Sequence, residues 1–144
     1  MKYLFYLSAV LLFGFISCKK EKPNDEMIND DPTTAVDTIG EGTFTGYQHS
    51  LAGDAILYTE VSGNKILRLE DFNMTAGPDV YVYLSTTSSF NAGAIQVAQL
   101  AVNTNYTNSN INFTVSSPSY TSSYKYVLVY CVQFSALFGY TELL

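Results

Sequence analysis

The sequence predicts an all-β domain, an antiparallel β-sandwich or partly closed barrel of about seven to ten short strands. Apolar and polar residues alternate through much of the chain after residue 40, most clearly at 80–85 (VYVYLS) and 111–115 (INFTV). Stretches rich in Gly, Asn, Pro and Ser separate these runs, as turns separate short strands. Beyond the N-terminal segment no apolar pattern of helical period continues for about ten residues, so a helical fold is not expected.

The expected strands are rich in β-branched and aromatic residues. They occupy 42–47 (GTFTGY), 54–61 (DAILYTEV), 65–72 (KILRLEDF), 80–85, 94–100 (AIQVAQL), 111–115, 124–132 (YKYVLVYCV) and 138–143 (FGYTEL). Gly63-Asn64 predicts a hairpin turn between the second and third runs. The run 94–100 could alternatively form a short helix. In 80–85 the valines and the leucine are expected to face the core, and Tyr81 and Tyr83 the opposite side.

Residues 1–17 predict a bacterial lipoprotein signal peptide. Lys2 precedes an apolar run that is shorter than the roughly 18–20 residues of a membrane-spanning helix. Small Ser17 stands directly before Cys18, so the cysteine is expected to become the new N-terminus and to carry lipid. Phe15 occupies the position where such signals usually have leucine. The alternative is an ordinary secretory signal in which Cys18 is incidental.

Residues 18–39 are predicted to form a flexible tether. They are rich in charge, Asn, Pro and Thr, and contain too few apolar residues to bury a core of their own. Their acidic residues predict a solvated spacer, or alternatively part of a surface-export signal. We therefore expect one domain at 40–144, anchored by lipid to a membrane of the bacterial cell envelope, on the periplasmic or surface face.

Charge and cysteine content restrict the function. Acidic residues outnumber basic ones, 13 to 7, which argues against nucleic-acid binding. The chain has two cysteines. If Cys18 is lipidated, Cys131 is left as a free thiol or as part of an intermolecular bond. If Cys18 is not lipidated, a Cys18–Cys131 disulfide is an alternative.

Three segments resemble the DM-thirteen electron-transfer domain, namely 42–58 (GTFTGYQHSLAGDAILY), 65–85 (KILRLEDFNMTAGPDVYVYLS) and 129–143 (VYCVQFSALFGYTEL). The resemblance implies a small β-sandwich that occurs beside DOMON domains and b-type cytochromes in animal cell-surface proteins, and alone in exported bacterial proteins. It implies electron transfer or oxidative modification at the cell surface. It also implies that Cys131, which matches the family cysteine, is a free thiol or helps to hold a prosthetic group such as heme.

Cys131 and His49 are the candidate redox residues. Cys131 lies in an apolar strand, where a cysteine usually acts as a small hydrophobic residue, but near the strand end, where His49 or Arg68 could approach. His49 is the only histidine and is either an ordinary loop residue or a partner that orients or deprotonates the thiol. With Met74 it could also supply the axial ligands of a b-type heme. One histidine and one cysteine are too few for a zinc site, so no metal is expected.

The segment 77–85 contains the other candidate residues. Gly77, Pro78 and Asp79 predict a structural turn in which Asp79 accepts backbone N–H groups of the preceding loop. Tyr81 and Tyr83 are expected to project together, where they could stack on a glycan or contact a partner protein.

Arg68 is expected to pair with Glu70 or Asp79, and it completes the candidate binding residues. No Gly-x-Ser-x-Gly elbow or paired-carboxylate site occurs, so we expect no catalytic activity of its own. The leading hypothesis is therefore an exported, lipid-anchored redox or electron-transfer accessory that uses Cys131 with a redox partner protein. The alternative is a binding or structural surface lipoprotein that presents Tyr81 and Tyr83.

Overall fold

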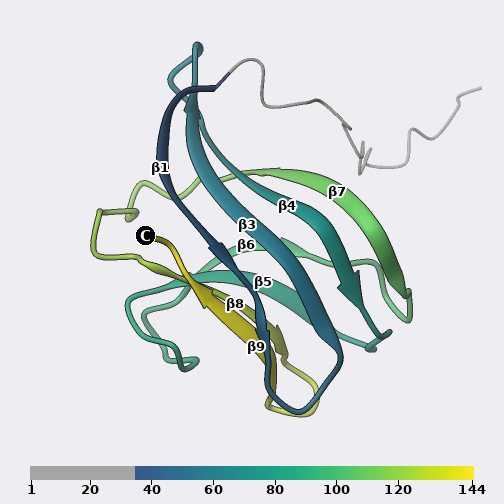
Figure 1. The fold of residues 1–144 in the computed structure, drawn as a ribbon. Coiled ribbons are helices and arrows are strands. Elements are labelled where there is room, and N and C mark those ends of the chain that lie inside the picture. Colours follow the sequence, from purple (N-terminus) through teal and green to yellow (C-terminus); the bar gives the residue numbers. More distant parts are fainter. Residues whose placement is uncertain (1–34) are drawn as a thin grey trace, which may run out of the picture.

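Two antiparallel β-sheets pack face to face in this computed structural model, which describes residues 35–144 (Figure 1). The first sheet has the order β1-β3-β4-β7 and contains β1 (Ala35–Thr43), β3 (Leu51–Glu60), β4 (Lys65–Met74) and β7 (Tyr106–Thr114). The second has the order β2-β9-β8-β5-β6 and contains β2 (Thr45–Gly46), β5 (Val80–Ser85), β6 (Ile95–Gln99), β8 (Tyr126–Cys131) and β9 (Ala136–Glu142). The predicted β-sandwich is confirmed, and the sheets do not close into a barrel.

Strand β1 includes residues that precede the domain boundary predicted at residue 40. Residues 35–39, assigned to the tether from the sequence, belong to β1 and pair with β3, with Ala35 opposite Glu60 and Thr38 opposite Tyr58. The side chains of residues 37–39 are exposed. Because β1 is an edge strand and these side chains face solvent, their composition resembles that of a flexible, solvated spacer. The predicted signal peptide, Cys18 and the rest of the predicted tether lie outside the described residues.

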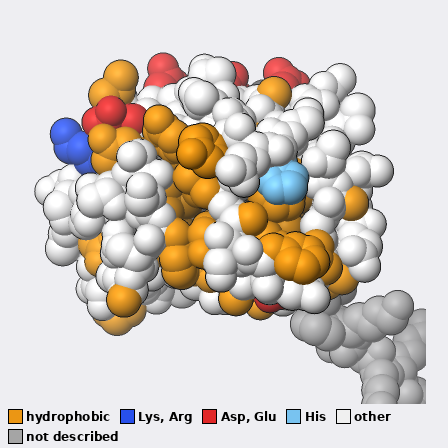
Figure 2. Space-filling view, turned by 90° about the horizontal axis from the view of Figure 1, so that it is seen from below, with side chains coloured by type: hydrophobic (Ala, Val, Ile, Leu, Met, Phe, Trp, Pro, Cys, Tyr) orange, Lys and Arg blue, Asp and Glu red, His pale blue; other side chains and the backbone are white. Residues whose placement is uncertain are grey.

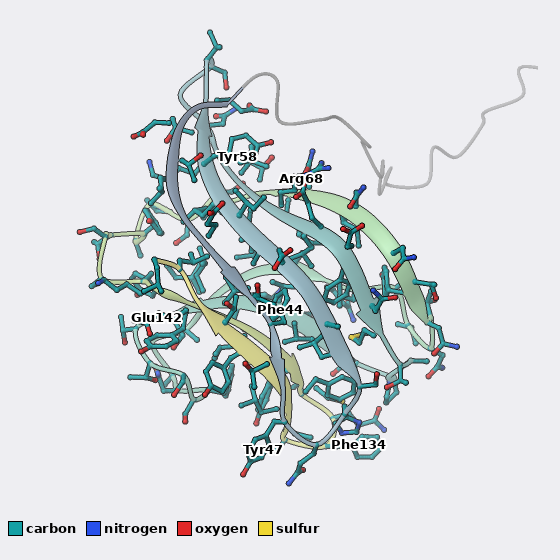
Figure 3. The ribbon with its side chains drawn as sticks, in the orientation of Figure 1. Phe44, Tyr47, Tyr58, Arg68, Phe134 and Glu142 are labelled. Carbon is teal, nitrogen blue, oxygen red and sulfur yellow. The ribbon has the colours of Figure 1, made fainter. Side chains whose placement is uncertain are left out.

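The chain crosses from the first sheet to the second at Phe44. β1 ends at Thr43 and β2 begins at Thr45, so Phe44 is the single residue between them. Phe44, which is labelled in Figure 3, is 6 % exposed. Its ring lies edge-on to that of Phe72, with centroids 5.8 Å apart. Its backbone N–H donates to the carbonyl of Gly53 at 2.9 Å. One buried ring thus fixes the position at which the two sheets separate.

The core lies between the sheets and follows the predicted alternation. Val80, Val82 and Leu84 are at most 1 % exposed, and Tyr81 and Tyr83 lie on the other side of β5. Ile111 and Val115 are also buried. Complete burial of a Val, Leu, Ile or Phe side chain contributes roughly 1.5–3 kcal/mol, so these inner faces provide the main stabilisation of the fold.

Two uncertain elements of the sequence are resolved by the structure. Segment 94–100 contains strand β6, which pairs with β5, and the alternative of a short helix is wrong. Gly63 has a φ of 87° in the turn between β3 and β4, which confirms the hairpin. No helix within residues 35–144 is long and apolar enough to cross a membrane.

Substitution of Gly53 by Ala is expected to destabilise the protein by roughly 3 kcal/mol or more. Gly53 has a φ of 112°, and a Cβ there would lie 2.6 Å from the carbonyl oxygen of Glu70. Gly63→Ala is the matched control, since its φ is 87° but no atom lies within 4 Å of the added Cβ. It should cost only the backbone strain of about 1 kcal/mol. The free energy of unfolding of both variants is measured by urea unfolding. Equal decreases for Gly53→Ala and Gly63→Ala would contradict the close approach at Gly53.

Candidate functional site

Cys131 is the last residue of β8 and points into the core. It lies in register between Val80 of β5 and Ala136 of β9. The residue is 0 % exposed and is a free cysteine. It shares the buried cluster with Val127 and Val129, which lie on the same face of β8. The closed fold therefore shields the thiol behind apolar side chains.

An exposed turn follows Cys131 directly and leads into β9. Val132 is 43 % and Phe134 67 % exposed, and Ser135 has a left-handed φ of 50°. The N–H of Val132 donates to the carbonyl of Asp79 at 2.9 Å, and that of Ser135 to the carbonyl of Val132 at 3.2 Å. Cys131 is thus fully buried and yet only one residue from the solvent-exposed end of its hairpin.

His49 lies in the loop between β2 and β3 and is exposed. Its ring stacks on Phe138, with centroids 3.8 Å apart and planes at 17°. Figure 2 shows the imidazole among apolar side chains on this end of the molecule. Phe138 is 2 % exposed and belongs to the same core cluster as Cys131. Within residues 35–144 no hydrogen bond joins His49 to Cys131, and Phe138 connects His49 to the core that contains the thiol.

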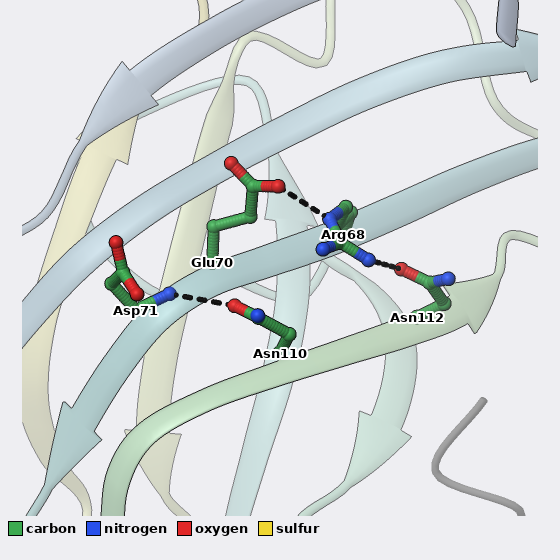
Figure 4. Close-up of polar contacts among 5 residues, drawn as sticks. All are labelled: Arg68, Glu70, Asp71, Asn110 and Asn112. Atoms are coloured by element: carbon green, nitrogen blue, oxygen red, sulfur yellow. Dashed lines mark hydrogen bonds and ion pairs between the residues drawn. The ribbon is translucent and has the colours of Figure 1, made fainter. Parts of the chain in front are cut away.

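Arg68 lies on the other sheet and does not join this group. Leu67 and Leu69 of β4 face the core, so Arg68 points to the outer face of the four-stranded sheet. Its Nε lies 2.7 Å from Oε1 of Glu70, and its Nη1 donates to Oδ1 of Asn112 at 3.1 Å (Figure 4). The predicted pairing with Glu70 is confirmed. The network accounts for a guanidinium that is only 4 % exposed.

The turn at 77–79 has a structural position. A Cβ on buried Gly77 would overlap Val80, so the turn packs directly against the core. The carboxylate of Asp79 accepts a hydrogen bond from Nε2 of Gln99 at 3.1 Å and another from the hydroxyl of Tyr81. Asp79 thus binds side chains of β5 and β6, rather than the backbone donors expected from the sequence, because β6 lies beside β5.

Aromatic rings cover the outer face of the five-stranded sheet. Tyr81 and Tyr83 lie 6.0 Å apart, as expected for residues that project together. Tyr83 is only 6 % exposed, because Phe90 packs edge-on against it at 4.9 Å. Phe90 in turn stacks on Tyr130, with centroids 4.1 Å apart and planes at 11°. The sequence analysis did not identify Phe90 as a candidate residue. The one feature that could have indicated it is that it is an isolated aromatic residue in a polar Ser/Thr loop.

Three phenols of this sheet, those of Tyr81, Tyr83 and Tyr126, have raised pKa values. Desolvation, the negative charge of Asp79 and its hydrogen bond raise the pKa of Tyr81. Desolvation and the neighbouring Tyr81 raise the pKa of Tyr83. The charge of Glu142 is the largest cause of the raised pKa of Tyr126.

The residues suggested for heme do not form a heme site. Met74 is 3 % exposed and packed in the core, whereas His49 is exposed and has one ring face on Phe138. No step of the proposed function therefore passes through heme. In the described part of the chain, no group of three His, Cys, Asp or Glu residues is placed to hold a metal ion.

The fold and these residues define a small antiparallel β-sandwich with a core cysteine at the end of a central strand. A family model described as electron transfer DM13 matches residues 43–143, and it covers most of the sandwich. The chain belongs to the DM13 electron-transfer family. The comparisons with curated proteins and with solved structures found no match.

Asp79→Asn is expected to lower the pKa of Tyr81 towards its ordinary value of 10.0, because the substitution removes a negative charge and weakens the hydrogen bond. Since Tyr81 ionises more easily in the unfolded chain, wild-type stability falls as pH rises through about 10. The stability of Asp79→Asn should fall less than that of the wild type over the same pH range. NMR titration of tyrosines labelled at Cζ measures the shift, with Tyr126 as the internal control. An unchanged Tyr81 titration would contradict the role of Asp79.

Proposed function

We propose that this protein is a lipid-anchored electron-transfer accessory of the bacterial cell envelope, with Cys131 as its redox group. Membership of the DM13 electron-transfer family supports the general function. The observation that carries the specific proposal is the position of Cys131, buried but directly before an exposed turn. If Cys18 carries lipid, Cys131 is also the only free thiol of the mature chain.

The proposed chemistry is thiol–disulfide exchange with a partner protein. The Cys131 thiolate attacks one sulfur of the partner's disulfide, a mixed disulfide forms, and the second sulfur leaves as a thiolate. The partner's disulfide is thus the electron acceptor, and no other oxidant is required. The thiol proton passes to solvent water once the strand end opens, because His49 stacks on Phe138 and no hydrogen bond joins it to Cys131 within residues 35–144.

Burial makes local opening a requirement of this chemistry. A thiol enclosed by apolar side chains has neither the thiolate character nor the access that exchange needs. Opening of the turn breaks the backbone hydrogen bond from Val132 to Asp79 and the pairing of Cys131 with Ala136. Such openings of strand ends cost less free energy than global unfolding.

Labelling of Cys131 by a thiol reagent measures this opening in a chain with Cys18→Ala, so that one thiol remains. We expect complete labelling under native conditions, roughly 100-fold slower than in denaturant, as an opening free energy of about 3 kcal/mol imposes. The rate should be insensitive to low urea concentrations, because local opening exposes little surface. Cys131→Ser is the blank. Total protection, or a rate that rises with urea in step with global unfolding, would refute Cys131 as the redox group.

The lipid anchor is tested at Cys18. The native chain is expected to incorporate radiolabelled palmitate and to sediment with membranes, whereas Cys18→Ala should do neither. Cys131→Ala is the matched control and should retain both properties. Membrane association that survives Cys18→Ala would contradict the lipid anchor. It would not affect the proposal for Cys131, which the labelling experiment tests separately.

A further inference from the structure

An open hollow of about 590 Å³ lies between the loop after β2, the loop after β5 and the β8–β9 hairpin. Its lining includes five aromatic residues, Tyr47, Phe90, Tyr130, Phe134 and Tyr140. Its volume is that of a typical small-ligand pocket. None of these five rings was a candidate in the sequence, because Tyr47, Phe90 and Phe134 come from three separate loops and meet Tyr130 and Tyr140 of β8 and β9 only in the fold.

Two rings at the rim are unusually exposed for aromatic side chains. Tyr47 is 68 % and Phe134 67 % exposed, and Figure 3 shows both at the same end of the sandwich. Exposed apolar groups gathered at one place often mark a binding site. The ring faces of Tyr47 and Phe134 are thus largely open to solvent, where an apolar ligand face can stack on them.

The wall of the hollow is held in place before any ligand arrives. Phe90 is fixed by its stack on Tyr130 and its edge contact with Tyr83. The loop of Tyr47 is fixed by its N–H, which donates to the carbonyl of Phe138 at 2.8 Å. A preformed wall lowers the entropic cost of binding.

The polar part of the lining is uncharged. It consists of the amide of Gln48 and the hydroxyls of Ser88, Ser89 and Ser135, with Ala136 and Leu137 completing the floor. An anionic or cationic ligand would find no opposite charge there. The matching ligand is neutral, rich in hydroxyl groups, and has flat apolar faces.

We propose that this hollow binds a neutral oligosaccharide, with Phe134 and Tyr47 as stacking platforms and Gln48 and the serines as hydrogen-bonding partners. A pyranose ring has an apolar C–H face that stacks on an aromatic ring and a rim of hydroxyls that pair with amides and hydroxyls. The site uses neither Cys131 nor His49, and it goes beyond the proposed electron-transfer function.

Calorimetric titration of the full chain, in a zwitterionic detergent without a sugar headgroup, tests the site. The probes are cellohexaose, xylohexaose, maltohexaose and mannohexaose, with hexagalacturonate as the anionic comparison. At least one neutral probe should bind with a Kd below about 1 mM. Phe134→Ala and Tyr47→Ala should each weaken binding roughly tenfold, the loss of one stacking ring. Phe134→Tyr should retain it.

Val132→Ala is the matched control, because Val132 is exposed on the same turn but does not line the hollow. It should leave the affinity unchanged, and thermal unfolding should show that each variant is folded. Failure of all neutral probes, equal binding of the anionic probe, or affinity unaffected by both alanine substitutions would overturn the proposal. The proposal would also be overturned if a partner protein bound at the hollow and no saccharide did. None of these outcomes depends on the reactivity of Cys131.

Discussion

Phe138 is the residue on which both candidate sites depend. Its ring is buried in the core that contains Cys131, and His49 stacks on it from outside. A side chain on Gly77 would approach the same ring to 3.0 Å, so the turn at 77–79 packs closely against Phe138. Its carbonyl accepts the N–H of Tyr47, which positions one wall of the aromatic hollow. Loss of this ring would therefore disturb the core and the histidine, whereas the backbone carbonyl that positions Tyr47 would remain.

The two outer faces of the sandwich differ in character. The four-stranded sheet carries the polar network of Arg68, Glu70 and Asn112, in which a nearly buried cation is matched by a carboxylate and an amide. Such a network leaves little free bonding capacity for a ligand. The five-stranded sheet instead carries stacked rings and neutral phenols. Both candidate sites therefore involve the five-stranded sheet, to which Cys131, Tyr130 and Tyr140 belong.

The sequence predicts what depends on alternation and local turns. The inward side of β5, the hairpin at Gly63 and the pairing of Arg68 with Glu70 were all accessible in this way, because each involves residues close in the chain. The same period groups Cys131 with Val127 and Val129 on one face of its strand, but both faces are largely apolar, so the burial of that face depends on neighbouring strands. The hollow was not predictable, because Tyr47, Phe90 and Phe134 come from three loops that only the strand order brings together. Likewise β1 begins at Ala35 because β3 provides a partner, which composition does not reveal.

The turn between β8 and β9 links the two proposals physically. Phe134 and Ser135 line the hollow, and the same turn closes the strand end at which Cys131 is buried. An open turn would displace Phe134 and remove one stacking platform, so the proposed oligosaccharide would bind the open form roughly tenfold more weakly than the closed form. A ligand shifts such an equilibrium by at most its difference in affinity for the two forms, and a tenfold difference corresponds to about 1.4 kcal/mol. If both proposals hold, occupancy of the hollow opposes exposure of the thiol, and the two proposed activities compete for the same turn.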